Sequence, residues 1–282
     1  MSPPTGETVA IGTFDGVHRG HRRVIEAALA AGSPVRVLTF DPHPRVVLGN
    51  RVEAIATLER RLELLHDLGV AGTTVLEFTL EVSQLEPEAF AAAHLPAGCT
   101  VVAGADFRFG RKRRGDLALL GSLGYEVVPV PLLDGVSSTE IRRHLHAGDV
   151  AAAARLLGRA PELDGSVVSG DQRGGTLGYP TANLAVEPAL LVPAYGIYAG
   201  AATVDGREYR AAVSIGTNPH YGGEERRIEP HLLDFEGDLY GSRLVVGLWE
   251  RLRDEQVFAS EAELVEQIAR DVEATRKAVR PD

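Results

Sequence analysis

The sequence predicts an α/β + β architecture: a domain built on a parallel sheet, then a small antiparallel β-barrel with a C-terminal helix. Three observations lead to this fold class. In the first half, short apolar runs rich in β-branched residues alternate with segments of helical periodicity, as in successive βαβ units. In the second half, short alternating segments are separated by Gly, Asn and Pro turns, as in small barrels. The chain then closes with a long segment of helical periodicity.

The first half contains predicted strands and helices that alternate along the chain. Strands are expected at residues 8–11, 35–40, 73–78, 100–103 and 125–130, and helices at residues 21–31, 57–68, 87–94 and 116–123. Gly69 stands where a glycine commonly ends a helix. Parallel sheets bind their ligands at the carboxyl ends of the strands, so the loops after these strands are the expected site.

Two further helices complete the first domain, which we predict to span residues 1–160. One begins at Ser137, which has the spacing of a capping box with Glu140, and the other covers residues 149–157. The second domain is predicted to span residues 161–282. Its strands are expected at residues 165–169, 197–203, 209–215, 231–235 and 244–249. Its helix is expected at residues 260–279, with Ser260 and Glu263 as a second capping box.

Composition excludes several classes of protein. The chain has 282 residues, 44% of them hydrophobic, which is enough for two cores. A net charge of −10 argues against a nucleic acid partner, which would favour a basic surface. The single cysteine, Cys99, excludes an internal disulfide framework and fits a reducing cytosol, so a cytoplasmic location is expected. We find neither a signal peptide nor a stretch of 18 apolar residues, so no membrane association is expected.

The first candidate site is the run GTFDGVHRGH at residues 12–21, between a predicted strand and a predicted helix. Such a junction presents backbone N–H groups and the positive end of the helix dipole to an anion. His18 and His21 are three residues apart, so both imidazoles can face one phosphate and stabilise charge on a transferring phosphoryl group. The simpler interpretation is two surface histidines beside a glycine-rich turn.

Other segments of the same half favour the phosphate site. Ser138, Thr139 and Arg142 belong to an SSTEIR run at a predicted helix start, and Asp106 lies in a GADFRFG run after a predicted strand. With TFDPHP at residues 39–44, these runs resemble the nucleotidyltransferase superfamily marked by HxGH and a late SSTxIR, specifically its bacterial FAD synthetase branch. The resemblance covers residues 8–158 and implies a Rossmann-like fold.

The resemblance also implies a reaction, in which the phosphate of FMN attacks the α-phosphorus of ATP and pyrophosphate leaves. Positioning and charge neutralisation would dominate, with Mg²⁺ neutralising part of the triphosphate charge. The implied residues are His18 and His21 as catalytic groups, Gly12, Phe14, Ser138, Thr139 and Arg142 for the ATP phosphates, and Asp106 in the flavin or nucleotide cleft. His43 either shapes a turn or touches substrate, and the basic run at residues 111–114 is either a phosphate lid or a solvated loop.

The second candidate site combines a glycine-rich loop with the run PTAN. Gly174, Gly175 and Gly178 belong to a loop whose N–H groups can surround phosphate, although such loops are often only flexible turns. Thr181 and Asn183 offer the oxygen atoms that Mg²⁺ prefers.

A lone glutamate and a later turn belong to the same candidate site. Glu229 stands in a strand-like stretch, where a surface carboxylate is the simpler interpretation and a general base for a substrate hydroxyl is the functional one. Pro230 beside it predicts an edge strand or a bulge. Asp238 is predicted to shape a turn.

The order GxxxGxxLGxPTAN, SIGTNP, Glu229, LLDF, DLYG over residues 163–278 resembles the riboflavin kinase family. The resemblance implies a small barrel that binds Mg-ATP beneath the glycine loop. It implies Gly174, Gly175, Gly178, Thr181 and Asn183 as ATP-binding residues, Thr181 and Asn183 as metal ligands, and Glu229 as the catalytic base.

The two resemblances together predict a bifunctional enzyme of FAD biosynthesis. Its partners would be the small molecules riboflavin, FMN and ATP, with FMN and FAD as products and Mg²⁺ as the cofactor. Two alternatives stay open at this point. One is an enzyme with a single working half or a different nucleotide or flavin, and the other is a flavin-binding protein without turnover. The sequence makes no prediction of oligomeric state.

Overall fold

The computed structural model describes residues 6–169, 178–217 and 226–281. The chain folds into two compact units. The first comprises Met1–Glu53 and Leu58–Ser137, and the second comprises Ala54–Thr57 and Ser138–Asp282. The domain boundary near residue 160 stays a prediction.

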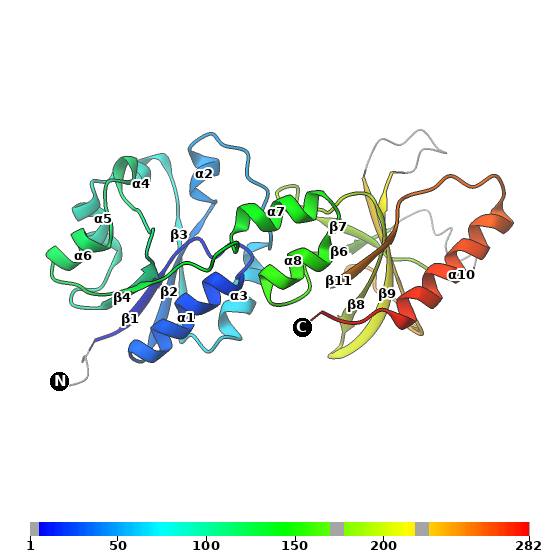
Figure 1. Cartoon of the computed structure of the whole chain (residues 1–282), viewed down its shortest axis with the longest axis horizontal. Helices are drawn as coiled ribbons and strands as arrows, with labels where there is room; N and C mark the ends of the chain where they lie inside the picture. The colour runs from blue at the N-terminus through cyan, green and yellow to red at the C-terminus, as the bar shows by residue number, and fades with distance from the viewer. Residues whose placement is uncertain (1–5, 170–177, 218–225, 282) are drawn as a thin grey trace. The chain divides into compact units, whose positions relative to one another are not determined.

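A five-stranded parallel sheet forms the centre of the first unit, in the order β3-β2-β1-β4-β5. Figure 1 labels β1 to β4 of this sheet. Its strands are β1 (Thr8–Ile11), β2 (Val35–Asp41), β3 (Gly72–Glu77), β4 (Thr100–Gly104) and β5 (Glu126–Val130). The predicted strands are confirmed to within one residue. The strands β2 and β3 lie on one side of β1, and β4 and β5 lie on the other. The turn after β1 is therefore at the switch point where such sheets bind ligands.

Helices pack on both faces of this sheet, because successive side chains of a strand point to opposite faces. Ala10 of β1 packs in one cluster with α1 (Arg19–Ala31) and α3 (Leu58–His66). Ile11 packs in the other cluster, with α5 (Pro87–His94) and α6 (Leu117–Ser122). The predicted α/β fold of the first half is therefore confirmed.

Three short elements were not predicted in this half. They are α2 (Pro44–Val47), α4 (Leu80–Gln84) and the 3₁₀ turn η1 (Arg111–Arg113). Segments of three to five residues are too short to display a helical period. The helix α1 also begins at Arg19, two residues before the predicted start.

A six-stranded antiparallel sheet forms most of the second unit, in the order β10-β9-β8-β11-β6-β7. Its strands are β6 (Glu162–Val168), β7 (Asn183–Val186), β8 (Gly196–Val204), β9 (Arg207–Gly216), β10 (Arg227–Leu232) and β11 (Arg243–Arg253). The two edge strands meet where the N–H of Ala182, just before β7, donates to the carbonyl of Pro230 in β10 at 2.9 Å. This bond nearly closes the sheet, which confirms the predicted barrel.

The core of the barrel also contains residues from earlier in the chain. Ile141 and Leu145 of α7 (Ser138–His146) and Leu157 of α8 (Val150–Leu157) pack in the same cluster as the barrel strands. Ile55 joins this cluster as well, and Ala54 forms a β-bridge with Leu190. Residues 54–57 therefore fold with the barrel, although they stand among the elements of the sheet in the sequence.

Two predictions in the barrel half are wrong in detail. The strand expected at residues 231–235 lies at Arg227–Leu232, although the N–H of Leu233 still donates in register to the carbonyl of Arg210 in β9 at 2.8 Å. Asp234 then has a φ of 59°, a left-handed conformation that ends the extended run. The prediction also omits β7, whose four residues are too few to display a period of two.

The helix α10 (Glu261–Lys277) closes the chain as predicted. The hydroxyl of Ser260 accepts the N–H of Glu263 at 3.3 Å, and the carboxylate of Glu263 accepts the N–H of Ala259 at 3.2 Å. The capping signal is thus confirmed, with the returning carboxylate bond one residue earlier than the motif predicts.

Gly200 in β8 offers a test of the barrel packing. A Cβ at this position would overlap the carbonyl oxygen of Gly247, whereas a Cβ at Gly247 would come no closer than 3.5 Å to its nearest neighbour. We expect Gly200→Ala to destabilise the barrel by about 1–3 kcal/mol, the usual cost of overpacking. Gly247→Ala is the control. Denaturant unfolding followed by the fluorescence of Trp249, the single tryptophan, reports on this unit, and equal midpoints for the two variants would contradict the expectation.

Candidate active sites

The turn between β1 and α1 contains the first predicted site. Phe14 and Val17 have positive φ angles of 49° and 42°, which a β-branched residue such as Val17 rarely adopts. Both side chains are buried in the core of the first unit, so packing offsets the backbone strain. The fold therefore holds this turn in a rare conformation next to the N-terminus of α1, as is common at functional sites.

His18 and His21 form a stacked pair at this helix N-terminus. Their ring centroids are 3.6 Å apart and the rings are inclined by 15°. His18 caps the helix, because its Nδ1 accepts the N–H of His21 at 3.3 Å. The ring of Phe14 meets that of His21 edge to face at 5.3 Å. The structure thus brings together Phe14 and the two histidines that the sequence analysis assigned to one site, directly after Gly12.

His21 carries a buried nitrogen with unmet hydrogen-bonding capacity. Its Nδ1 has no partner among the described residues. Burial, then the neighbouring imidazole of His18, then the guanidinium of Arg61 lower the pKa of His21 well below its usual value. At neutral pH the ring is therefore uncharged, with one N–H to donate. Leaving a buried nitrogen unpaired costs free energy, which marks this histidine as a residue not chosen for stability alone.

Arg61 is the residue of this region that the sequence analysis missed. It is only 5% exposed, and its guanidinium donates to the carbonyl of Thr13 at 3.0 Å and to the carboxylate of Asp41 at 3.2 Å. Burial lowers the pKa of Arg61, while Asp15 and Asp41 oppose that shift. One signal was available, because an arginine on the buried face of a predicted amphipathic helix is unusual.

The remaining predicted residues of the first site lie on two other segments. Ser138 and Thr139 form the first turn of α7, and Arg142 stands one turn further along the same helix, in the second compact unit. Asp106 is exposed in the loop after β4, at the carboxyl end of a parallel strand. Each thus occupies a position that can meet a ligand, a helix start or a strand end.

Local contacts favour one of the two roles considered for His43 and one of the two considered for the basic run at residues 111–114. His43 caps α2, because its Nδ1 accepts the N–H of Arg45 at 3.1 Å, which favours the role of shaping a turn. Arg111 and Arg114 are exposed and both pair with the carboxylate of Glu86, which favours the solvated loop over the phosphate lid.

The barrel brings the PTAN run next to the strand that carries Glu229. Gly174 and Gly175 lie outside the described residues, and Gly178 has a φ of 83°, which suits glycine. The bond from Ala182 to Pro230 places the flanking residues Thr181 and Asn183 along the edge strand β10. The prediction that Pro230 marks an edge strand is confirmed.

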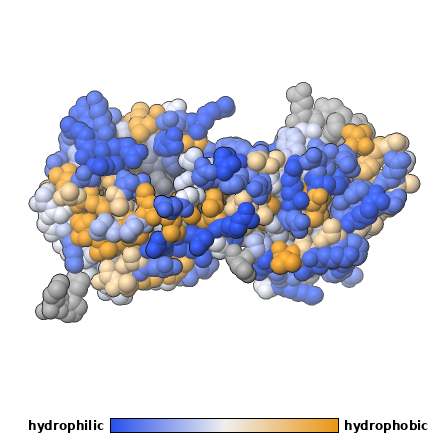
Figure 2. Space-filling view, viewed as in Figure 1, coloured by the Kyte–Doolittle hydropathy of each residue, from blue (hydrophilic) through white to orange (hydrophobic). Residues whose placement is uncertain are grey.

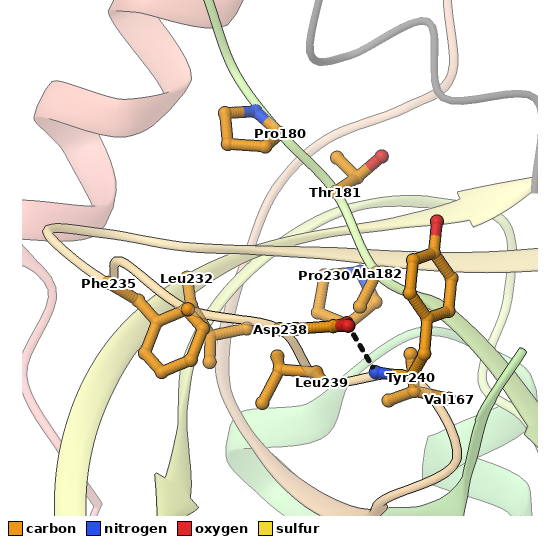
Figure 3. A pocket seen from close by; sticks show the side chains of 11 residues that line it. Val167, Pro180, Thr181, Ala182, Pro230, Leu232, Phe235, Asp238, Leu239 and Tyr240 are labelled. Carbon is orange, nitrogen blue, oxygen red and sulfur yellow. Dashed lines mark hydrogen bonds between the residues drawn. The ribbon is translucent and has the colours of Figure 1, made fainter. Parts of the chain in front are cut away.

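A pocket opens beside this junction (Figure 3). It is lined by Val167, Pro180, Thr181, Ala182, Pro230, Leu232, Phe235, Gly237, Asp238, Leu239 and Tyr240, and its volume is about 180 Å³. Most of its lining residues are apolar in type, and Thr181, Asp238 and Tyr240 bring polar groups to its wall. Asp238 accepts the N–H of Tyr240 at 2.9 Å, drawn as a dashed line in Figure 3, so its predicted role in shaping a turn is confirmed.

Glu229 lies on the other face of β10. Burial alternates along this strand, with Pro230 on the buried face and Glu229 and His231 on the half-buried one. The carboxylate of Glu229 is 4.0 Å from the guanidinium of Arg227, and Nδ1 of His231 donates to the carbonyl of Pro180 at 2.7 Å. Glu229 therefore lies on the edge strand that the PTAN segment follows, and it is not among the residues that line the pocket.

The residues described contain no helix long and apolar enough to cross a membrane. Hydrophilic residues interrupt the hydrophobic ones across the face that Figure 2 shows.

Comparisons with known proteins match both halves of the chain. The family model described as FAD synthetase matches residues 1–141, and the one described as riboflavin kinase matches residues 157–279. A "Bifunctional riboflavin kinase/FMN adenylyltransferase" of Listeria monocytogenes is 37% identical over 96% of this chain and 91% of its own length. A protein of Escherichia coli with the same name is 36% identical over 96% and 92%.

The whole fold also has a counterpart among solved structures. A crystal structure titled "Macrolide-efflux Protein from Streptococcus pneumoniae" superposes with a TM-score of 0.87 at 33% identity, and covers 98% of this chain and 95% of that one. A protein with a different title therefore also combines these two folds in one chain.

Proposed function

This chain belongs to the family of bifunctional riboflavin kinases/FMN adenylyltransferases, and from that membership we propose how its residues divide the two reactions. The enzyme phosphorylates riboflavin to FMN with ATP and transfers an adenylyl group from a second ATP to FMN, giving FAD. The FAD synthetase match lies in the first half of the chain and the riboflavin kinase match in the second.

The stacked histidines are the observation that carries the adenylyl site. We assign His18 and His21 to the phosphates of ATP, on the N-terminus of α1 whose N–H groups and dipole favour an anion. An oxygen of the FMN phosphate attacks the α-phosphorus, the bond to the bridging oxygen breaks, and pyrophosphate leaves. The ring of His21 is half-buried, and an N–H on its accessible side can donate to the oxygen atoms on which charge accumulates.

Further residues complete this assignment. Gly12 and Phe14 of the same turn are also assigned to the ATP phosphates, and Asp106 to the flavin or nucleotide cleft. Ser138, Thr139 and Arg142 of α7 bind the β- and γ-phosphates, since hydroxyls, free N–H groups and a guanidinium suit that charge.

The barrel is assigned to the kinase reaction. Thr181, Asn183 and the glycines at 174, 175 and 178 bind ATP, and the apolar pocket is large enough for only part of a flavin or nucleotide. Glu229 takes the proton of the 5′-hydroxyl of riboflavin as that oxygen attacks the γ-phosphorus and ADP leaves. Its support is its position on the strand edge that the PTAN segment follows.

Mg²⁺ is the proposed cofactor. The side chains of Thr181 and Asn183 offer oxygen donors at alternate positions of one extended segment, which fits a cation that prefers oxygen and retains waters. When bound, the ion would neutralise charge on the transferred phosphoryl group. We also propose a cytoplasmic location, in line with the single cysteine, and a boundary near residue 160 between the two catalytic domains.

One time course tests the assignment of both activities. Purified protein with riboflavin, ATP and Mg²⁺ is expected to form FMN and then FAD, separated by chromatography. FMN without FAD would point to a single working half, and no turnover of either flavin would favour a binding protein. Removal of Mg²⁺ with a chelator is expected to stop both steps and readdition to restore them, because the triphosphate charge is then uncompensated.

A further inference from the structure

We propose that Arg61 is a positioning residue for adenylyl transfer, which holds the turn from Gly12 to His21 in its ligand-binding shape through the carbonyl of Thr13. The inference rests on the function proposed for that turn. It adds a residue of α3 to a site that the sequence motifs build only from the loops after β1 and β4 and from α7.

The contacts of Arg61 join two separate segments of the first unit. Its guanidinium donates to the carbonyl of Thr13 at 3.0 Å, and the hydroxyl of Thr39 donates to the same carbonyl at 3.0 Å. Its other terminal nitrogen is 3.2 Å from a carboxylate oxygen of Asp41. One side chain therefore ties the histidine-bearing turn to the TFDPHP segment at the end of β2.

The Arg61 guanidinium is buried, so its hydrogen bonds and its ion pair are needed to offset the loss of hydration. At 5% exposure the guanidinium has left water, which costs free energy unless the charge is paired and hydrogen-bonded. The Nε of Arg61 is itself buried without a partner among the described residues. An apolar side chain would fill the same place without this desolvation penalty, so packing alone does not account for an arginine.

The turn needs such support because its backbone is strained. Phe14 and Val17 both have positive φ, and the N–H of Val17 donates to the carbonyl of Phe14 at 3.0 Å. Such conformations persist only where the surroundings over-determine them. Without Arg61, the carbonyl of Thr13 loses one of its two side-chain donors, and the turn can relax toward ordinary angles.

The charge of Arg61 also acts on His21. The charged groups around the imidazole are His18, stacked on it from the helix cap, and Arg61 from α3, whose charge is balanced by Asp15 and Asp41. Removing the guanidinium takes away one of the causes that lower the pKa of His21, so that pKa rises and the imidazolium forms at a higher pH.

Three variants test the proposal in the full-length enzyme. Arg61→Met removes charge and donors, Arg61→Lys keeps the charge without the two-pronged contact, and Arg36→Met removes a half-exposed arginine of the same unit as a control. For each, the titration of His21 is followed by NMR of histidine-labelled protein, with its resonance assigned by its loss in His21→Ala. The rates of FAD formation from FMN and of FMN formation from riboflavin are measured in parallel.

In Arg61→Met we expect a raised pKa of His21 and a kcat for FAD formation lowered about 10²-fold, the effect of a small misplacement. Arg61→Lys is expected to retain the low pKa and to lose about tenfold in kcat, with FMN formation unchanged. An unchanged His21 titration in Arg61→Met, or wild-type FAD turnover in Arg61→Lys, would overturn the proposal. If Arg61→Met fails to fold, the rate of FAD formation by Arg61→Lys tests the proposal by itself. Because the titration needs no turnover, it is independent of whether His21 acts as proposed.

Discussion

Replacing His21 with alanine is expected to lower FAD formation by about 10²–10³-fold, the usual cost of removing one donor that stabilises transition-state charge. The variant removes an imidazole that stacks on His18 at the N-terminus of α1, so the site loses one of its two histidine donors. FMN formation from riboflavin is expected to stay near normal, because that reaction is assigned to the barrel. Chromatography of the flavins formed from riboflavin and, separately, from FMN measures both rates.

A matched variant separates this effect from a general loss of structure. His66→Ala removes an exposed histidine at the end of α3 in the same unit, and we expect both activities to be unchanged. An equal loss of both activities in a folded His21→Ala protein would contradict two separate sites. Normal FAD formation in that variant would remove His21 from adenylyl transfer.

Replacing Glu229 with glutamine is expected to lower FMN formation at least about 10²-fold, the low end for losing a general base. The change keeps the size of the side chain and removes only its ability to take a proton. Added FMN should still be converted to FAD at the normal rate. The rate of ADP release with riboflavin as substrate measures the first reaction without the second.

Two control variants make this prediction specific to position. Glu250→Gln changes an exposed carboxylate of the barrel strand β11 in the same way and is expected to have no effect. Asp238→Asn changes the carboxylate that lines the pocket, which is engaged with the N–H of Tyr240, and is expected to cost less than Glu229→Gln. The reverse order of effects would assign the base to the pocket and not to the half-buried face of β10.

Local patterns were sufficient for most of the fold. Each strand of the parallel sheet was predicted to within one residue, because β-branched runs bounded by turns carry their own signal. The motifs were also local, since the candidate ligand-binding residues of GTFDGVHRGH and of PTAN each lie within a run of at most ten residues. Errors arose where the pattern was too short, as at β7, or where apolar residues continued past the end of a strand, as at residues 233–235.

The sequence by itself determined the two folds, their order and the residue types of both sites. Only the tertiary structure decided which distant residues support them. It alone places Arg61 beneath the turn that carries His21, residues 54–57 in the barrel core, and Glu229 on the face of β10 opposite to the pocket. The physical reason is that periodicity and capping depend on neighbours along the chain. A buried ion pair or a strand edge depends instead on contacts between segments tens of residues apart, which no local pattern encodes.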